Sequence, residues 1–413
     1  MVLERHLLRV ALESLASFRV TVISGPRQSG KTTLVKELVG QSGSYWSFDD
    51  ESVRSAAGLD PHGFVEQGPW PVALDEVQRG GDAVVLAVKS VVDRRTERGQ
   101  FVLAGSTRFL SVPQLSESLA GRAEILDLWP FSQGELLGVR ETFLDTLLGV
   151  PDELASRRFE GVGRVELFGR LIRGGFPELI DAAPSMATRW YRSYVRTVVE
   201  RDVVTTSAFT QADELPTLLR LIAANTSGEL VAARLAGDAR MSVDTVSRYL
   251  ALLELVGFIV RIRAWTPSLT SREKRHPKVI ISDTGLACAL LGRNIDGLGS
   301  PTSALTGPML ESFVAMELIK QRGWSSRQPT IRHWRDRNGA EIDLIVEDDD
   351  GTIAGIEVKA SVTVSSADVK NLRLLQDKLG NRFAAGVILY LGERAVPLGE
   401  RLWALPVAAL WSD

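Results

Sequence analysis

Two glycines, a lysine and a threonine near the start of the chain are spaced as a phosphate-binding loop requires. Gly25 and Gly30 lack a Cβ, so backbone N–H groups between them can turn inward around an anion. Lys31 would neutralise charge on the β- and γ-phosphates, and the Thr32 hydroxyl would ligate Mg²⁺. The spacing predicts that ATP and Mg²⁺ are bound by Gly25, Pro26, Arg27, Gln28, Ser29, Gly30, Lys31, Thr32 and Thr33.

Two adjacent acids follow a short apolar run downstream of this loop. The segment Val72-Ala73-Leu74 is strand-like, and Asp75 and Glu76 come directly after it. This pattern is typical of a Walker B strand, in which Asp75 holds Mg²⁺ and Glu76 polarises the attacking water. An acidic cap on an ordinary strand is the alternative, and the upstream loop disfavours it.

Hydrolysis of ATP also needs groups that contact the γ-phosphate. Ser106, after a third apolar run, is the candidate sensor hydroxyl, although Gly105-Ser106-Thr107 is also a plain turn sequence. Arg122 is the candidate cation, with Arg108 as second choice, and a solvated surface arginine is the alternative.

A second group of charged residues lies near the C-terminus. Asp343 is on one expected strand, and Glu357 and Lys359 are on the next. Side chains at i and i+2 of a strand share a face, and an antiparallel partner strand would bring Asp343 beside them. Carboxylates in this arrangement can bind Mg²⁺, and a lysine can orient a water for phosphodiester hydrolysis. An ion pair on a sheet face is the alternative.

The elements that must position these groups fall into three blocks. Residues 1–150 alternate strand and helix patterns, which predicts a parallel sheet covered by helices, the α/β core of an ATPase. Residues 151–265 are mainly helical. Residues 266–413 return to mixed α/β, with a core at about 305–395.

Within the helical block, residues 214–265 follow the order helix, short helix, turn, helix and β-wing, which is typical of a winged helix. Ser242 can cap the third helix, whose first turns present polar groups where base edges would be read. Arg261 and Arg263 could touch phosphate, and the run from Arg272 to Lys278 could contact DNA or be a solvated loop. A protein-packing role stays open, because Asp244 lies on the presumed reading face.

Five segments together resemble a prokaryotic AAA-type ATPase family whose C-terminal domain, of uncharacterised function, is related to restriction-type nucleases. The resemblance runs from about Leu3 to about Leu379 and is carried by GPRQSGKTT, ALDEVQ, LAGSTRFL, SLAGRAEILDLWPFSQGE and GGFPE. It implies an AAA-like core, a winged-helix region and a PD-(D/E)xK tail. Glu311 matches the additional acidic position of the tail, so the implied metal ligands there are Glu311, Asp343 and Glu357.

Composition narrows the class of protein without identifying its partners. The chain is 45% hydrophobic and 24% charged, which is globular, and its net charge of −3 excludes a strongly basic coat protein. No uncharged apolar run reaches the roughly 20 residues that span a bilayer. A single cysteine, Cys288, excludes an intramolecular disulfide. We therefore expect a cytoplasmic protein that does not enter a membrane.

Two functions from different classes fit these observations. One is an ATP-hydrolysing machine that acts on DNA through the winged helix and the C-terminal domain, with a Mg²⁺-dependent nuclease tail. The other is a STAND-like regulatory switch, in which ATP controls partner binding and the tail binds without cleaving. A homo-oligomer is compatible with either function.

Overall fold

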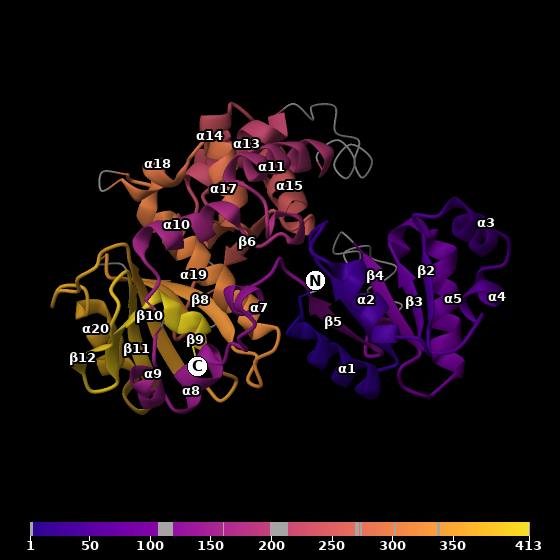
Figure 1. Ribbon diagram of the computed structural model, residues 1–413, viewed down its shortest axis with the longest axis horizontal. Coiled ribbons are helices and arrows are strands. Elements are labelled where there is room, and N and C mark those ends of the chain that lie inside the picture. Colours follow the sequence, from indigo (N-terminus) through magenta and orange to yellow (C-terminus); the bar gives the residue numbers. More distant parts are fainter. Residues whose placement is uncertain are drawn as a thin grey trace. The chain divides into compact units, whose positions relative to one another are not determined.

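The computed structural model describes residues 3–105, 119–159, 161–198, 214–268, 272, 275–300, 303–336 and 339–412. They form two compact units, shown in Figure 1. The N-terminal unit comprises Met1–Phe131 with Leu255–Gly257, and the C-terminal unit comprises Ser132–Glu254 and Phe258–Asp413. The division between the two compact units therefore falls after Phe131, earlier in the chain than the expected boundary at residue 150. It does not break at residue 265, because Ala264 forms a bridge with His333 of the C-terminal sheet.

The N-terminal unit is built on a parallel five-stranded sheet. Its order is β2-β3-β4-β1-β5. The central strands β1 and β4 are buried along their whole length because helices cover both faces, as expected for parallel sheets. The bounds are β1 Val20–Ser24, β2 Ser44–Ser47, β3 Val72–Asp75, β4 Phe101–Gly105 and β5 Ala123–Asp127.

Two separate apolar clusters cover the two faces of this sheet. Val22 packs with residues of α4 and α5, whereas its neighbour Ile23 packs with residues of α1 and α2. Alternate side chains of a strand point to opposite faces, so the result is a three-layer α/β/α unit. The helix bounds are α1 Leu7–Ser17, α2 Lys31–Val39, α3 Glu51–Leu59, α4 Pro61–Val65, η1 Val77–Arg79 and α5 Gly81–Arg94.

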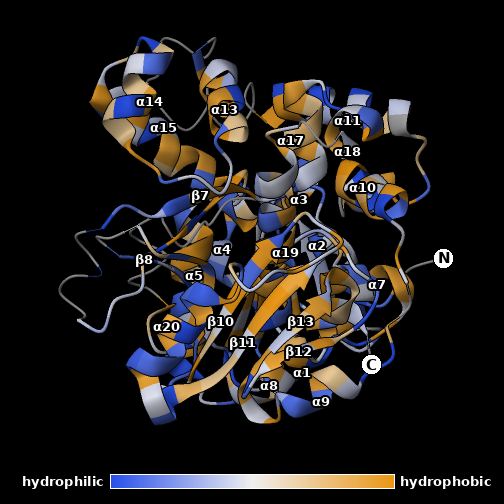
Figure 2. Cartoon of the chain, turned by 90° about the vertical axis from the view of Figure 1, so that its left-hand side faces the viewer, coloured by the Kyte–Doolittle hydropathy of each residue, from blue (hydrophilic) through white to orange (hydrophobic). Residues whose placement is uncertain are grey.

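The C-terminal unit contains a mixed six-stranded sheet of order β12-β13-β11-β10-β9-β8. The central strand β11 is almost wholly buried and is coloured mostly hydrophobic in Figure 2. β9 and β10 are antiparallel, and Leu344 pairs with Ile356. The bounds are β8 Thr330–Arg335, β9 Glu341–Glu347, β10 Ile353–Lys359, β11 Phe383–Tyr390, β12 Val396–Gly399 and β13 Leu402–Pro406.

Helices pack against this sheet and form a second layer beside it. α20 contacts β10 and β11, and its leucines Leu372 and Leu375 join the apolar cluster over the sheet. α19 packs against β10, and α11, α10 and α13 gather around α17. The bounds are α7 Gln133–Leu137, α8 Phe143–Gly149, α9 Asp152–Ser156, α10 Arg164–Arg173, η3 Pro177–Leu179, α11 Pro184–Val198, α17 Thr284–Leu291, α18 Ile295–Gly299, α19 Thr306–Arg322, α20 Lys370–Leu379, η6 Gly380–Arg382 and η7 Val407–Trp411.

Three helices and a two-stranded ribbon follow one another in the middle of the chain. They are α13 Leu215–Ala224, α14 Ala232–Ala239, α15 Val243–Leu255, β6 Ile259–Ile262 and β7 Lys278–Ile281, with β6 antiparallel to β7. Ser242 caps α15, since its Oγ accepts a hydrogen bond from Thr245 N at 3.1 Å. The three helices and β6 follow the order expected for residues 214–265, whereas β7, the partner strand of β6, lies beyond residue 265. The expected fold class, a parallel-sheet α/β core with a separate C-terminal mixed-sheet domain, is confirmed.

Candidate functional site

The loop between β1 and α2 has the backbone conformation of a phosphate cradle. Gly25 has φ +158°, and a Cβ there would lie 2.1 Å from Leu128 O, so the close approach of the loop to this carbonyl requires glycine. Gly30 has φ +96° and immediately precedes α2. The N-terminus of α2 therefore follows directly on the loop, where its N–H groups favour an anion.

Lys31 is held across this loop. It is only 5% exposed, and its Nζ donates hydrogen bonds to Gly25 O at 3.0 Å and to Pro26 O at 2.7 Å. The ammonium group therefore lies against the loop backbone, the position from which it can neutralise bound phosphate. Pro26, Arg27 and Gln28 lie in the loop itself, whereas Thr33 is an exposed residue of the first turn of α2.

Thr32 and Asp75 meet at the carboxyl ends of β1 and β3. Thr32 Oγ1 donates to Asp75 Oδ2 at 2.7 Å, although the two residues are far apart in the chain. Parallel strands place their carboxyl ends at one edge of the sheet, which is why the two motifs come together. Asp75 is 2% exposed. Its carboxylate oxygens and the neighbouring Thr32 Oγ1 are hard ligands, the kind that Mg²⁺ prefers.

Tyr45 is a member of this site that the sequence did not reveal. Its hydroxyl donates to Asp75 Oδ2 at 2.8 Å, and burial together with the charge of Asp75 raises the pKa of Tyr45 far above its usual range. The tyrosine stays a neutral donor that orients the carboxylate. The sequence pattern could indicate only that the strand of Tyr45, β2, pairs with the strand of Asp75, β3. No motif or spacing in the sequence connects the two residues.

Glu76 occupies a left-handed backbone conformation, with φ +51°. This turn follows β3 and leads into η1, and Gln78 Nε2 donates a hydrogen bond to the Glu76 carboxylate. The Ser29 hydroxyl, fully buried in the loop, has no hydrogen-bond partner among the described residues. A buried polar atom of this kind in a phosphate-binding loop fits a loop built to receive a ligand.

Ser106 and Arg108 lie outside the described residues, so the structure does not place these two candidates. Arg122 is placed away from the phosphate-binding loop of its own chain, and its role as the cation for the γ-phosphate stays a prediction. Its carbonyl accepts a hydrogen bond from Val20 N, at the amino end of β1, whereas the phosphate-binding loop follows the carboxyl end. The guanidinium pairs instead with Asp93 at 2.7 Å.

The second candidate group, near the C-terminus, also comes together. In β9 and β10, Asp343 and Glu357 lie next to the paired residues Leu344 and Ile356, and Asp343 Oδ2 accepts a hydrogen bond from Val358 N at 2.9 Å. Lys359 pairs with Glu357 at 3.2 Å. Glu311 approaches from α19, which packs against β10.

A lysine that the sequence did not single out lies among these carboxylates. Lys278, the first residue of β7, is 3% exposed. Its Nζ lies 2.7 Å from Glu311 Oε1, 2.9 Å from Glu341 Oε1 and 3.6 Å from Asp343 Oδ1. Burial opposes the charge of Lys278, but the surrounding carboxylates outweigh it and raise its pKa above the usual range. The ammonium is therefore the cation of the cluster.

Negative charge is in excess around Lys278. Burial, reinforced by the charge of Asp343, raises the pKa of Glu311 to about 8 and that of Glu357 to about 8. Among the described residues, no group of histidine, cysteine, aspartate and glutamate side chains is arranged to hold a metal ion. The Lys278 ammonium thus lies between two of the expected metal ligands, Glu311 and Asp343, and the metal-binding role of Glu311, Asp343 and Glu357 stays a prediction.

The arginines proposed for phosphate contact are engaged within the protein. Arg261 pairs with Glu254 at 3.0 Å. Arg272 is 8% exposed and makes a bidentate pair with Glu347, at 2.7 and 2.8 Å. Arg272 is thus neither a DNA contact nor part of a solvated loop, and it anchors the segment before β7 to β9. On α15 the exposed polar residues are Ser242, Asp244, Ser247 and Arg248.

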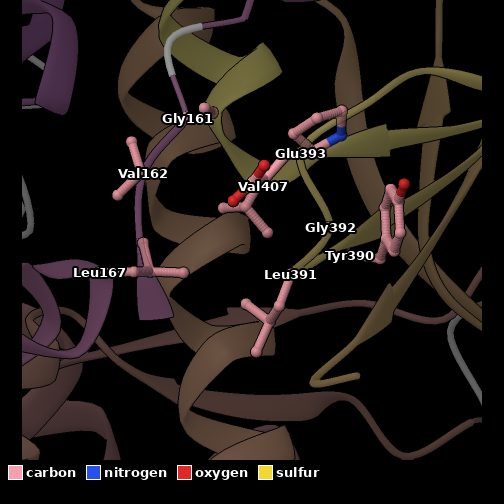
Figure 3. A pocket seen from close by; sticks show the side chains of 10 residues that line it. Gly161, Val162, Leu167, Tyr390, Leu391, Gly392, Glu393 and Val407 are labelled. Carbon is pink, nitrogen blue, oxygen red and sulfur yellow. The ribbon is translucent and has the colours of Figure 1, made fainter. Parts of the chain in front are cut away.

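A small crevice in the C-terminal unit offers no further chemistry. Figure 3 shows Val162 and Leu167 on one side and Tyr390 and Glu393 on the other. Its cavity volume of about 10 Å³ corresponds to a single water site. The helices within the described residues include none long and apolar enough to cross a membrane.

Comparison with protein families divides the chain into three parts. An AAA domain matches residues 17–137, a domain of unknown function (DUF8612) matches residues 164–296, and another domain of unknown function (DUF4143) matches residues 306–410. The expected AAA-type P-loop domain is confirmed. The winged-helix and nuclease-like assignments stay predictions, since neither matched family has a described function.

Two mycobacterial proteins resemble nearly the whole chain. They are the uncharacterized proteins Rv2008c of Mycobacterium tuberculosis and Mb2031c of Mycobacterium bovis. Each is 30% identical over 390 residues, covering 94% of this chain and 80% of the relative.

Among solved structures, the Walker-type ATPase PABY2304 of Pyrococcus abyssi is 16% identical, with a TM-score of 0.47 over 70% of this chain and 96% of that one. The RuvB Holliday junction branch migration motor of Thermotoga maritima is 20% identical, with a TM-score of 0.29 over 65% of this chain and 91% of that one.

Proposed function

The chain belongs to the family that includes the mycobacterial proteins Rv2008c and Mb2031c, and from this premise we propose that it is an ATP-driven regulatory switch that hydrolyses ATP with Mg²⁺. The observation that carries hydrolysis is the hydrogen bond of 2.7 Å between Thr32 and Asp75. It brings the expected metal ligands of two separate motifs together, beside the lysine of the phosphate-binding loop.

Each residue of this site has a defined task in the proposed reaction. Thr32 and Asp75 hold Mg²⁺, which supplies charge stabilisation for the β- and γ-phosphates. Lys31 neutralises phosphate charge from the loop, and Tyr45 orients Asp75. Glu76 orients and polarises the attacking water from its strained turn after β3. Ser106 stays a prediction as the γ-phosphate sensor.

Glu76→Gln is expected to separate ATP binding from hydrolysis. The amide keeps the size of the side chain and its contact with Gln78 but cannot polarise water, so turnover should fall by about a hundredfold or more. Phosphate release at saturating MgATP measures turnover, and fluorescence of a labelled ATP analogue measures affinity. Gln78→Ala, which leaves the acid in place, is the control. Unchanged turnover in Glu76→Gln would exclude Glu76 as the residue that activates water.

The switch is favoured over a nuclease by one observation. The buried ammonium of Lys278 lies among Glu311, Glu341 and Asp343, where a nuclease of this type would hold Mg²⁺. In this arrangement the C-terminal domain is proposed to bind a partner without cleaving nucleic acid. ATP binding and hydrolysis would set the state in which the partner is bound.

DNA is the second candidate partner, because the first turns of α15 expose Ser242, Ser247 and Arg248 on the third helix of a helix-turn-helix order. Duplex DNA should bind with an affinity that falls steeply as salt rises. Arg248→Ala should weaken DNA binding several-fold. It should also reduce by about one the number of counterions released on binding, which the slope of affinity against salt concentration measures. Fluorescence anisotropy of a labelled duplex measures both effects, and Arg220→Ala on α13 is the control.

In the same Mg²⁺ buffer with ATP, supercoiled plasmid and single-stranded DNA should stay intact. Cleavage by the wild-type chain that disappears in Asp343→Ala would overturn the non-cleaving role and restore the nuclease. If no duplex binds in a salt-sensitive way, DNA is excluded as the partner, and the partner of the switch is then expected to be a protein.

A further inference from the structure

The carboxylates around Lys278 converge on one point. Glu311 from α19 and Glu341 and Asp343 from β9 place oxygens 2.7, 2.9 and 3.6 Å from the same nitrogen. A fourth carboxyl group, Glu357, is 4% exposed, and its Oε1 has no hydrogen-bond partner among the described residues. Oxygens that surround one point in a buried site form a cation-binding arrangement.

An ammonium group and a divalent cation cannot share this point. Mg²⁺ or Mn²⁺ requires carboxylate oxygens at about 2.0–2.2 Å, which is shorter than the contacts that Lys278 makes. The two positive charges would also repel each other strongly in a buried site. Occupation by Lys278 and occupation by a divalent cation are therefore alternatives.

The ribbon that carries Lys278 fixes its position. Lys278 pairs with Ile262 in the ladder between β6 and β7, and it also forms a bridge with Glu229 on the other side. His333 Nε2 lies 3.1 Å from His276 O, just before β7. The cation thus comes from the β6–β7 ribbon, whereas the carboxylates come from α19 and from β9 of the six-stranded sheet.

We propose that Lys278 is the resident cation of this carboxylate cluster and excludes divalent cations from it while β7 keeps its present pairing. The site is thereby held closed by a contact between two regions of the same chain. A shift of β7 that withdraws Lys278 would open a divalent-cation site lined by Glu311, Glu341 and Asp343. This inference does not rest on ATP hydrolysis at the phosphate-binding loop.

Binding of Mn²⁺ to the full-length chain without nucleotide tests the proposal. Titration calorimetry compares the wild type with Lys278→Met, which keeps an unbranched side chain, shorter by the terminal nitrogen, and removes its charge. We expect the variant to gain one site that binds Mn²⁺ at least about tenfold more tightly than any corresponding site of the wild type. Lys278→Arg, which keeps the charge, should behave as the wild type does.

Asp343→Asn identifies the site in both backgrounds. Added to Lys278→Met, it should abolish the new site, whereas in the wild type it should change nothing. An Mn²⁺ site in the wild type that depends on Asp343 and is as tight as that of Lys278→Met would overturn the proposal. So would a folded Lys278→Met chain that gains no site.

The comparison of the wild type with Asp343→Asn does not depend on the folding of a Lys278 variant. Circular dichroism monitors folding, because removing Lys278 takes the shared counter-ion from three partly buried carboxylates. If Lys278→Met does not fold, Lys278→Gln takes its place, because its neutral amide can still donate hydrogen bonds. A gain of Mn²⁺ binding in Lys278→Gln supports exclusion by charge, and no gain overturns it.

Discussion

Lys31→Ala is expected to reduce ATP turnover by about a thousandfold. The Lys31 ammonium lies against the loop backbone, 3.0 Å from Gly25 O and 2.7 Å from Pro26 O, so it is already in place for the β- and γ-phosphates. No other lysine is within the loop, and the charge that develops on the transferred phosphoryl group would lose its preorganised cation. Steady-state phosphate release at saturating MgATP measures the loss.

Lys89→Ala provides the matched control for this prediction. Lys89 lies in α5, outside the phosphate-binding loop, and its replacement removes the same side chain without touching the site. Turnover should then stay close to that of the wild type. Turnover retained in Lys31→Ala would mean that ATP is hydrolysed at another site or by a contaminant, and it would remove the basis for the proposed switch.

Arg272→Ala is expected to destabilise the C-terminal unit by about 3–5 kcal/mol. The guanidinium makes two hydrogen bonds to Glu347, at 2.7 and 2.8 Å, and a third to Thr266 O at 2.6 Å. Trp265 Nε1 also donates to Glu347, at 3.1 Å. Removing Arg272 would take the closest counter-ion from the partly buried carboxylate of Glu347 and leave only the more distant Arg332, at 3.5 Å, and Arg382, at 4.0 Å.

The pair also predicts how stability changes with pH. Burial alone would raise the pKa of Glu347, but the hydrogen bonds from Arg272 and Trp265 outweigh it and lower the pKa below the ordinary value of 4.5. A lowered carboxyl pKa stabilises the folded chain above pH 4.5, and this contribution is lost as pH falls through the folded value. Arg272→Ala should therefore lose most of this acid-sensitive contribution.

Hydrogen exchange followed by mass spectrometry can measure the effect locally. Amides of β8 and β9 should exchange faster in Arg272→Ala, whereas those of the N-terminal unit should be unchanged. Arg220→Ala is the control, because this exposed arginine of α13 contacts Thr217 on its own helix and its loss should cost less than about 0.5 kcal/mol. Equal protection of β9 in Arg272→Ala and the wild type would contradict a structural role for the pair.

The nucleotide site could be predicted closely because its information is local. The glycines of the loop, Lys31 and Thr32 are adjacent in the chain, and the strand and helix on either side set their conformation directly. Placing Asp75 beside the loop requires one further inference, namely that the carboxyl ends of two parallel strands lie at the same edge of a sheet. Arg122 directly precedes β5, which runs parallel to β1, so the same rule places Arg122 at the amino end of the strand, away from the loop.

The C-terminal cluster shows the limit of that reasoning more sharply. Asp343, Glu357 and Lys359 follow the alternation of two paired strands, so their proximity could be expected from spacing. Lys278 lies on the two-stranded ribbon of β6 and β7, and no periodicity connects it with Glu341 on β9. Its charge changes the chemistry of the whole group, yet the segment that carries it resembled a solvated basic loop.

By itself, the sequence determined the phosphate-binding loop, the acid that completes it, the α/β class of the core and the strands that carry the C-terminal carboxylates. Each of these depends on residues close in the chain or on the period of one element. The tertiary structure alone decided that Tyr45 orients Asp75, that Arg122 pairs with Asp93 and that Lys278 lies among the carboxylates of the C-terminal cluster. Contacts of this kind depend on how distant elements pack, and local sequence does not encode which buried charges will meet.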